Sequence, residues 1–169
     1  MRVIQMATKL RSGTNETQAT VLKILQQAPR LARSSPLIST SEVLIHHIDI
    51  TVTDLARSRA FYVQALAPLG LTPMMEFTNH SGQQLVGFGA LPDPEFWIRD
   101  GGPMDHRLHV AFLAPTRAAV DGFHAAAVSA GGQDNGAPGL RPRYAEHYYA
   151  AFVLDPDGHN IEAVCRSAK

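Results

Sequence analysis

Alternating apolar and polar side chains predict the first strand of the folded part of the chain. In the segment HHIDITV, residues 46–52, His46 and three aliphatic residues occupy the even-numbered positions, and His47, Asp49 and Thr51 occupy the odd-numbered ones. Successive side chains of a strand point to opposite faces of a sheet, so the aliphatic face is expected to lie against a helix. The face that carries His47 is then expected to border a wetter environment.

The same pattern recurs 62 positions later along the chain. The segment HIDITVTDLARSRAFYVQALAPLG, which starts at His47, resembles HVAFLAPTRAAVDGFHAAAVSAGG, which starts at His109. In each copy a strand is followed by a helix whose first turn has a side-chain oxygen as N-cap, Asp54 or Thr116. Each helix is expected to end at glycine, which favours a left-handed exit. These glycines are Gly70 in the first copy and Gly131–Gly132 in the second.

Strand-like segments follow both predicted helices. Residues 133–144 are rich in glycine and proline and are predicted to form a loop. Asp155-Pro156-Asp157-Gly158 is typical of a type I turn between two strands. The predicted strands are residues 71–77, 83–90 and 95–100 in the first copy, and 148–155 and 160–165 in the second. The sequence therefore predicts an α+β fold in which two βαβββ modules, residues 44–101 and 106–166, pair into a curved mixed sheet around a cavity.

The first 43 residues are predicted to be an N-terminal extension. Apolar residues recur at helical spacing over residues 17–32, where Pro29 favours an end or a kink of the helix. A Ser-rich stretch with Pro36 follows and is typical of a linker. Residues 1–40 carry six basic groups and one acid. This composition fits an organelle transit peptide, which would direct the chain to the mitochondrion, or a helix that packs on the domain.

The amino-acid composition indicates what class of protein the chain belongs to. The chain has 169 residues, of which 45% are hydrophobic and 18% charged, as expected for one soluble globular domain. Its single cysteine, Cys165, permits no internal disulfide, which favours a reducing compartment such as the cytoplasm. The net charge of zero combines +5 over residues 1–40 with −5 over the remainder. An acidic folded part argues against nucleic-acid binding, and no apolar run is long enough to suggest a membrane span.

The segments IHHIDITVTDLARSRAFY, LHVAF and DPDGHNIEAV resemble the vicinal oxygen chelate superfamily. This superfamily includes glyoxalase I, fosfomycin-resistance thiol transferases, extradiol dioxygenases and bleomycin-resistance proteins. The resemblance spans residues 44–166 and implies a glyoxalase-like domain over residues 44–169. It also implies the theme that these proteins share, a divalent metal chelated by two neighbouring oxygen atoms of a substrate. It does not specify the reaction.

The family places metal ligands on the first and last strands of its modules. Carried over residue by residue, the resemblance implies that His47, His109 and Glu162 bind one divalent cation, with Mn, Fe, Zn, Co or Ni as candidates. Two imidazoles and one carboxylate leave coordination positions open for a substrate. Glu162 is also the expected catalytic residue, as a proton acceptor if it left the metal. The alternative is that each histidine is a structural residue held by hydrogen bonds.

One position departs from the four-ligand pattern of glyoxalase I-like members. The expected equivalent of Glu162 in the first module is Trp97, whose side chain does not bind metals. Glu95 lies two residues away on the same face and would come closer if the register were shifted. A three-ligand site is therefore predicted, which weakens an assignment as glyoxalase I.

Further residues are expected either to line a substrate pocket or to lie in the core or in a solvated loop. Basic groups near residue 141 would hold an anionic substrate by charge-assisted hydrogen bonds, and aromatic groups would form apolar walls. The candidates are Asp49, Phe88, Trp97, Arg141, Arg143, Tyr144, Tyr148 and Tyr149.

Two functions remain open on the sequence alone. The first is a metal-dependent enzyme, a lyase, isomerase, thiol transferase or dioxygenase, that chelates a small oxygenated substrate. The second is a metal-free protein of the bleomycin-resistance type that sequesters a small molecule, and Trp97 in place of a fourth ligand favours it. In both cases the expected partners are a small molecule and a second copy of the chain, with the modules pairing within or between chains.

Overall fold

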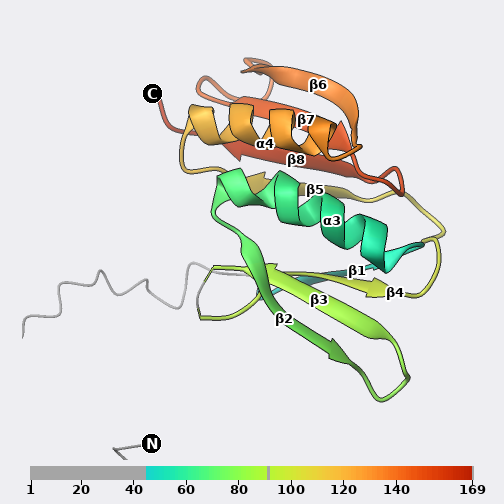
Figure 1. Cartoon of the computed structure of the whole chain (residues 1–169). Helices are drawn as coiled ribbons and strands as arrows, with labels where there is room; N and C mark the ends of the chain where they lie inside the picture. The colour runs from blue at the N-terminus through green and yellow to red at the C-terminus, as the bar shows by residue number, and fades with distance from the viewer. Residues whose placement is uncertain (1–44, 91, 169) are drawn as a thin grey trace, which may run out of the picture. The chain divides into compact units, whose positions relative to one another are not determined.

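The computed structural model describes residues 45–90 and 92–168, which form two modules of the same topology (Figure 1). The N-terminal extension predicted over residues 1–43 lies outside the described residues. In the described part of the chain, no helix is both long and apolar enough to cross a membrane.

The first module is a four-stranded sheet with one helix. Its elements are β1 (Ile48–Val52), α3 (Leu55–Leu66), the 3-10 helix η2 (Ala67–Leu69), β2 (Thr72–Thr78), β3 (Gln84–Gly89) and β4 (Phe96–Asp100). The strand order is β1-β4-β3-β2, with β1 parallel to β4 and the other pairs antiparallel.

The second module repeats this arrangement. Its elements are β5 (His109–Leu113), α4 (Arg117–Ser129), β6 (Gln133–Leu140), β7 (Tyr149–Leu154) and β8 (Asn160–Cys165). The strand order is β5-β8-β7-β6, and β5 is parallel to β8. The predicted α+β class and the two βαβββ modules are thus confirmed. Each module contributes its own hydrogen-bonded sheet of four strands among the described residues.

Strand β6 corrects the prediction of a loop for residues 133–140, whereas residues 141–144 lie outside the strand. It is the edge strand of its sheet, and its pairing with β7 is interrupted by irregularities between Asp134 and Gly136 and between Gly136 and Gly139. Pro138 lacks an N–H group, which an edge strand tolerates because one side of it has no partner. Glycine and proline therefore mark an irregular edge strand here, and not the absence of a strand.

The predicted helix ends are confirmed by hydrogen bonds and backbone angles. Asp54 accepts a hydrogen bond of 3.0 Å from the backbone N of Arg57, and Thr116 accepts one of 3.1 Å from Ala119. After the helices, Gly70 and Gly131 have φ angles of 83° and 97°, in the left-handed region that favours glycine.

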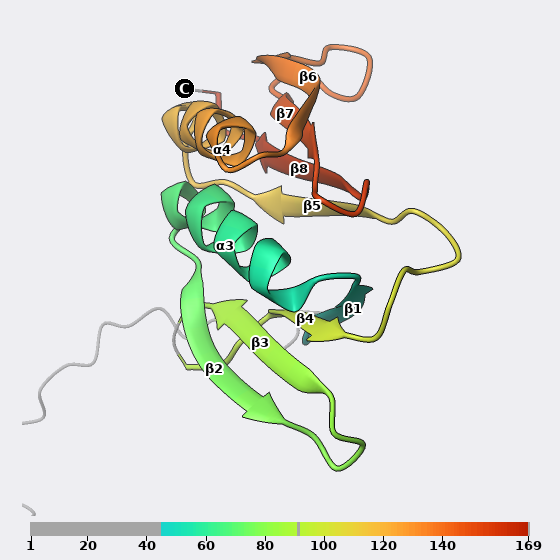
Figure 2. The same ribbon diagram turned by 45° about the vertical axis from the view of Figure 1, so that its right-hand side comes forward.

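The two helices pack against each other, and each covers one face of its own sheet (Figure 2). The predicted alternation is visible in β5, where Val110 is buried and His109, Ala111 and Leu113 are exposed. On the helix side the core is continuous between the modules, since the rings of Phe96 and Phe112 lie 5.3 Å apart. Among residues 45–90 and 92–168, no helix covers the opposite face of either sheet.

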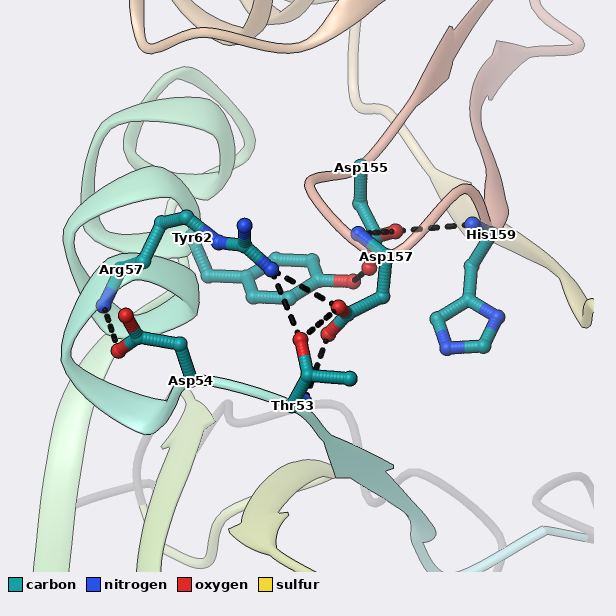
Figure 3. A network of polar contacts seen from close by, with 7 residues as sticks. All are labelled: Thr53, Asp54, Arg57, Tyr62, Asp155, Asp157 and His159. Carbon is teal, nitrogen blue, oxygen red and sulfur yellow. Dashed lines mark hydrogen bonds and ion pairs between the residues drawn. The ribbon is translucent and has the colours of Figure 1, made fainter. Parts of the chain in front are cut away.

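A network of polar contacts fastens the β7–β8 turn to the first module (Figure 3). The predicted turn is confirmed by a hydrogen bond of 2.9 Å from Gly158 N to Asp155 O. The buried carboxylate of Asp155 accepts a hydrogen bond of 2.6 Å from the hydroxyl of Tyr62 on α3. Burial and the adjacent Asp155 raise the pKa of Tyr62 well above its usual value. The hydroxyl therefore remains a proton donor across the neutral pH range.

Asp157 adds a second connection in the same network (Figure 3). Its carboxylate accepts hydrogen bonds from the backbone N and the hydroxyl of Thr53 and one of 2.9 Å from the guanidinium of Arg57. Behind the turn, Nδ1 of the buried His159 accepts a hydrogen bond of 3.1 Å from the backbone N of Leu108. The turn before β8 is thereby fixed to both the β1–α3 junction and the start of β5.

Candidate metal centre and substrate pocket

Glu162 interrupts the apolar strand β8 because it forms a pair with a histidine on the neighbouring strand. Its side chain is only 3% exposed, and its Oε2 lies 2.9 Å from Nε2 of His109. β5 and β8 are parallel, with His109 opposite Asn160 and Ala111 opposite Glu162. The pair therefore lies on the open face of the second sheet, away from α4. Burying a carboxylate costs free energy unless it is paired, and this pairing explains why the strand tolerates it.

The second oxygen of Glu162 is held by a tyrosine. The hydroxyl of Tyr148 donates a hydrogen bond of 2.8 Å to Oε1. Burial, followed by this hydrogen bond, raises the pKa of Tyr148 to about 12. Tyr148 therefore remains protonated at neutral pH and fixes the orientation of the carboxylate, whose other oxygen faces His109.

Asn160 orients the imidazole, a role that the sequence candidates did not include. Its side-chain Nδ2 donates to Nδ1 of His109, so that Nε2 carries the proton and donates to Glu162. Asn160 lies two residues before Glu162, on the same face of β8. That spacing is the signal in the sequence that would have identified it.

His109 and Glu162 fit a pair of metal ligands. Two ligands at neighbouring corners of an octahedral site, each about 2.1 Å from the metal, lie roughly 3 Å apart. The observed separation of 2.9 Å between Nε2 and Oε2 matches this value. Without a metal, the proton on Nε2 bridges the same two atoms. A neutral His109 that bound a cation through Nε2 would carry its proton on Nδ1, and the amide of Asn160 would turn so that its oxygen accepts from that N–H.

His47 lies apart from this pair. It is exposed, precedes the first residue of β1, and its Nδ1 lies 2.9 Å from Nδ1 of His46. It borders a pocket on the first module together with Asp49, Phe77 and Trp97. Over residues 45–90 and 92–168, no three His, Cys, Asp or Glu side chains form a group that could hold a metal. A single chain thus brings two of the three predicted ligands together.

The strand registers identify the equivalent of Glu162 in the first module. Trp97 pairs with Asp49 across β1 and β4, just as Glu162 pairs with Ala111 across β5 and β8. Asp49 and Ala111 are related by the 62-residue repeat. Trp97 is therefore the structural counterpart of Glu162. Glu95 precedes β4 and does not take that position.

Two of the predicted pocket residues lie on the helix sides of the sheets. Phe88 is fully buried in the core, 6.0 Å from the ring of Tyr62. Tyr149 donates a hydrogen bond of 2.7 Å to Asp121 of α4, and Arg117 lies over its ring. Both side chains lie on the side of their strand that faces a helix. They therefore line the core and not an open pocket.

The basic loop candidates lie at the edge of the second sheet. Arg141 lies over the ring of Phe152, 5.5 Å from its centroid, and donates to the carbonyl oxygen of Ala137. Arg143 and Tyr144 are exposed. On the first sheet, Asp49 forms an ion pair of 3.2 Å with Arg99.

The chain is similar in structure to several solved proteins. A glyoxalase/bleomycin resistance protein from Albidiferax ferrireducens T118 matches with a TM-score of 0.58 and 27% identity, over 73% of this chain and 100% of that one. A mutant form of glyoxalase I from Zea mays matches with a TM-score of 0.56 and 22% identity, over 71% of this chain and 46% of that one. A glyoxalase/bleomycin resistance protein/dioxygenase family enzyme from Burkholderia phytofirmans PsJN matches with a TM-score of 0.54 and 18% identity, over 72% and 98%.

No curated protein matches the chain in sequence. The family model of the Glyoxalase/Bleomycin resistance protein/Dioxygenase superfamily, by contrast, matches residues 44–163, which include the first module, the second module up to the middle of β8, and all three predicted ligands. Together with the two βαβββ modules and their structural relatives, this match shows that the chain belongs to the glyoxalase/bleomycin resistance protein/dioxygenase superfamily.

Proposed function

We propose that the chain is a divalent-metal-dependent enzyme that acts on a small oxygenated molecule, and that its metal centre forms between two copies of the chain. The observation that carries this proposal is the arrangement of the predicted ligands. His109 and Glu162 lie 2.9 Å apart at ligand spacing, whereas His47 lies on the other module. A second chain that supplies its own His47 completes the set of three.

The open faces of both sheets support pairing with a second copy. Large apolar side chains are exposed there and nearby, with 73% of Leu113, 50% of Met75 and 45% of Phe77 accessible. Clusters of this kind mark interaction sites. In a twofold dimer the first module of one chain meets the second module of its partner, and this contact occurs twice. Each of the two sites then takes His47 from one chain, and His109 and Glu162 from the other.

The residues of the second module have distinct roles in this mechanism. A bound divalent cation supplies a positive charge that stabilises negative charge on two neighbouring substrate oxygens. Asn160 holds the imidazole of His109 in place, and Tyr148 fixes one carboxylate oxygen of Glu162. Glu162 would accept a proton from the substrate at its other oxygen, Oε2, after that oxygen has left the metal. This set of groups serves a lyase, an isomerase, a thiol transferase or a dioxygenase.

Metal uptake tests the proposal directly. The protein and its His47→Ala, His109→Ala and Glu162→Gln variants are dialysed against each candidate metal and then analysed for bound metal. The parent is expected to hold one ion per chain and the three variants much less, because each loses one ligand while its fold is kept. His80→Ala is the matched control, since His80 is an exposed histidine between β2 and β3 and is not a proposed ligand.

Acid should release the metal as well. A ligating histidine must be neutral, and free histidine titrates at about 6.5. Bound metal is therefore expected to fall as the pH falls through the acid range, with uptake of protons. If the parent binds no metal at neutral pH, or the ligand variants match its uptake, sequestration of a small molecule without metal replaces the proposed function. Trp97 at the position of a fourth ligand is the observation that would then favour it.

A further inference from the structure

Trp97 occupies the position of a ligand on the open face of the first module, and it is the only tryptophan of the chain. The residues beside Trp97 on the neighbouring strands determine where its ring lies. Gly87 is its cross-strand partner on β3, and Met75 is the partner of Gly87 on β2. The three positions form one row across the sheet, with the glycine in the middle.

The glycine provides the space in which the indole lies. A Cβ atom at position 87 would lie 2.8 Å from Cη2 and Cζ3 of Trp97 and 2.9 Å from Cβ of Pro94. Carbon atoms in contact normally lie about 3.5–4.0 Å apart. Any larger residue at position 87 would therefore push the indole away from the sheet. The glycine on the neighbouring strand therefore fixes the position of the indole against the sheet.

Apolar groups continue from the indole to form a slot. The ring of Phe77 lies edge-on to Trp97, with centroids 5.6 Å apart and an interplanar angle of 78°. Leu85 and Pro94 complete the apolar wall, and His47 borders the same pocket. Trp97 is half-buried, and Phe77 is 45% exposed. Partly exposed aromatic groups around a hollow, with a few polar groups at its edge, are typical of a small-molecule site.

The charges at this pocket disfavour an anion. Asp49 and Asp93 line it, and no lysine or arginine is among its described lining residues. The nearby Arg99 is engaged by Asp49 at 3.2 Å. A carboxylate or phosphate in the slot would therefore meet like charge, and no basic side chain among the described lining residues would compensate it.

We propose that this slot binds a flat aromatic group without negative charge, stacked against Trp97 and bordered by Phe77. The inference rests on the proposed function in one respect. The aromatic group is the part of the substrate that lies beside His47, while the chelating oxygens lie at the metal. The slot thus assigns the substrate to planar aromatic compounds and gives Trp97 the role of a specificity-determining residue.

A single fluorine signal can report on the slot. The full chain is labelled with 5-fluorotryptophan, so that Trp97 gives the only fluorine resonance of the protein. Three probes with the same two-ring carbon skeleton are titrated: 2-naphthol, its anionic analogue 2-naphthoate, and the saturated, non-planar decahydro-2-naphthol. A saturable shift is expected with 2-naphthol, with binding about tenfold weaker for the other two because they lose stacking or add like charge. No shift with 2-naphthol, or equal affinity for all three probes, would overturn the proposal.

Variants of the slot test which side chains contribute to the binding of 2-naphthol. Phe77→Ala removes a side chain that is 45% exposed and should leave the fold intact, as circular dichroism can check. By calorimetry, Phe77→Ala and Trp97→Leu should each weaken 2-naphthol binding about tenfold. Val128→Ala, on the exposed side of α4, is the matched control and should bind like the parent. Unchanged affinity in both slot variants would also overturn the proposal.

The titrations are repeated with metal and with EDTA to separate this inference from the proposed function. Binding of 2-naphthol by a protein that takes up no metal would support the slot and overturn the metal centre. Metal uptake by a protein that does not bind 2-naphthol would overturn the slot and leave the metal centre standing.

Discussion

The two modules share one topology, but equivalent positions carry different chemistry. In the second module a carboxylate, Glu162, pairs with His109 at 2.9 Å. In the first module the register places an indole, Trp97, at the equivalent position, and the repeat equivalent of His109 is His47, which is exposed. One module thus holds two potential ligands close together, and the other presents one histidine beside an aromatic wall.

This difference shows how a repeated fold can build an asymmetric site. A carboxylate inside a sheet needs partners because a buried unpaired charge is costly, and Tyr148 and His109 supply them. An indole needs only space, which Gly87 supplies. Two such half-sites are complementary. If the modules of two chains face each other, polar ligands stand opposite an apolar wall, as an enzyme for a partly apolar substrate requires.

The largest expected effect comes from making the two modules alike. Trp97→Glu puts a carboxylate at the counterpart of Glu162, next to His47. We expect metal affinity to rise about hundredfold, because a fourth ligand, the second anionic one, adds to the site. Calorimetric titration of the parent and the variant with the same metal checks this. Trp97→Gln has the same length without the charge and is the control. Equal affinity of all three proteins would show that Trp97 does not face the metal site.

A second difference concerns the helices, where Tyr62 of α3 and His124 of α4 are repeat equivalents. Tyr62 donates to the buried Asp155, whereas His124 pairs with the exposed Asp134. Tyr62→Phe leaves one oxygen of Asp155 without a partner and should lower the free energy of unfolding by about 2 kcal/mol. His124→Phe should change it much less, because that pair is solvated. Urea unfolding of both variants measures the contrast, which equal losses would contradict.

The carboxamide of Asn160 gives a smaller expected effect on metal binding. Asn160→Asp places a carboxylate against Nδ1 of His109, where it accepts a proton and makes the imidazole a stronger ligand. We expect metal affinity to rise about tenfold in calorimetry. Glu95→Gln, at the equivalent position of the first module, should leave the affinity within about twofold of the parent, since no bond of its side chain to His47 is seen. A weaker metal site in Asn160→Asp would argue against the role given to Asn160.

The pH dependence of stability provides the smallest expected effect, and only in alkali. The pKa of Tyr62 is raised in the folded chain by burial and by Asp155. Above about pH 10 the unfolded tyrosine loses its proton while the folded one keeps it. The stabilisation that Tyr62 contributes to the folded chain is therefore complete below pH 10, and it is lost as the pH rises through the pKa of Tyr62 in the folded chain. Urea unfolding at pH 8, 10 and 11 should show a steeper loss for the parent than for Tyr62→Phe. If the free energy of unfolding fell equally with pH in both proteins, Tyr62 would not contribute to the pH dependence of stability.

The sequence predicted what depends on local pattern. The N-caps Asp54 and Thr116 and the span of β8 were predicted because caps and strand alternation are short-range signals. β6 was missed because glycine and proline argue against a strand, and only its place at a sheet edge makes them acceptable. The separate pairing of the two sheets depends on contacts between modules, which no local pattern encodes.

The sequence pointed to the proposed ligands of the candidate site but not to the residues around them. The repeat and the family resemblance identified His109 and Glu162, which the structure brings together. Asp155 and Asp157 were explained completely by the turn they form, so nothing in the sequence pointed to their contacts with α3 and the β1–α3 junction. Tyr62 had the pattern of an ordinary core residue, because the bond of its hydroxyl to Asp155 joins positions far apart in the chain.

A mixed dimer tests most directly whether the metal centre forms between two chains. His47→Ala and Glu162→Gln chains carrying different tags are produced together, and the heterodimer is isolated by both tags. One of its two sites then combines His47 of the Glu162→Gln chain with His109 and Glu162 of the His47→Ala chain, so it should bind one metal ion. Each variant alone should bind much less. A heterodimer without metal, or failure of the two chains to associate, would contradict a metal centre shared between chains.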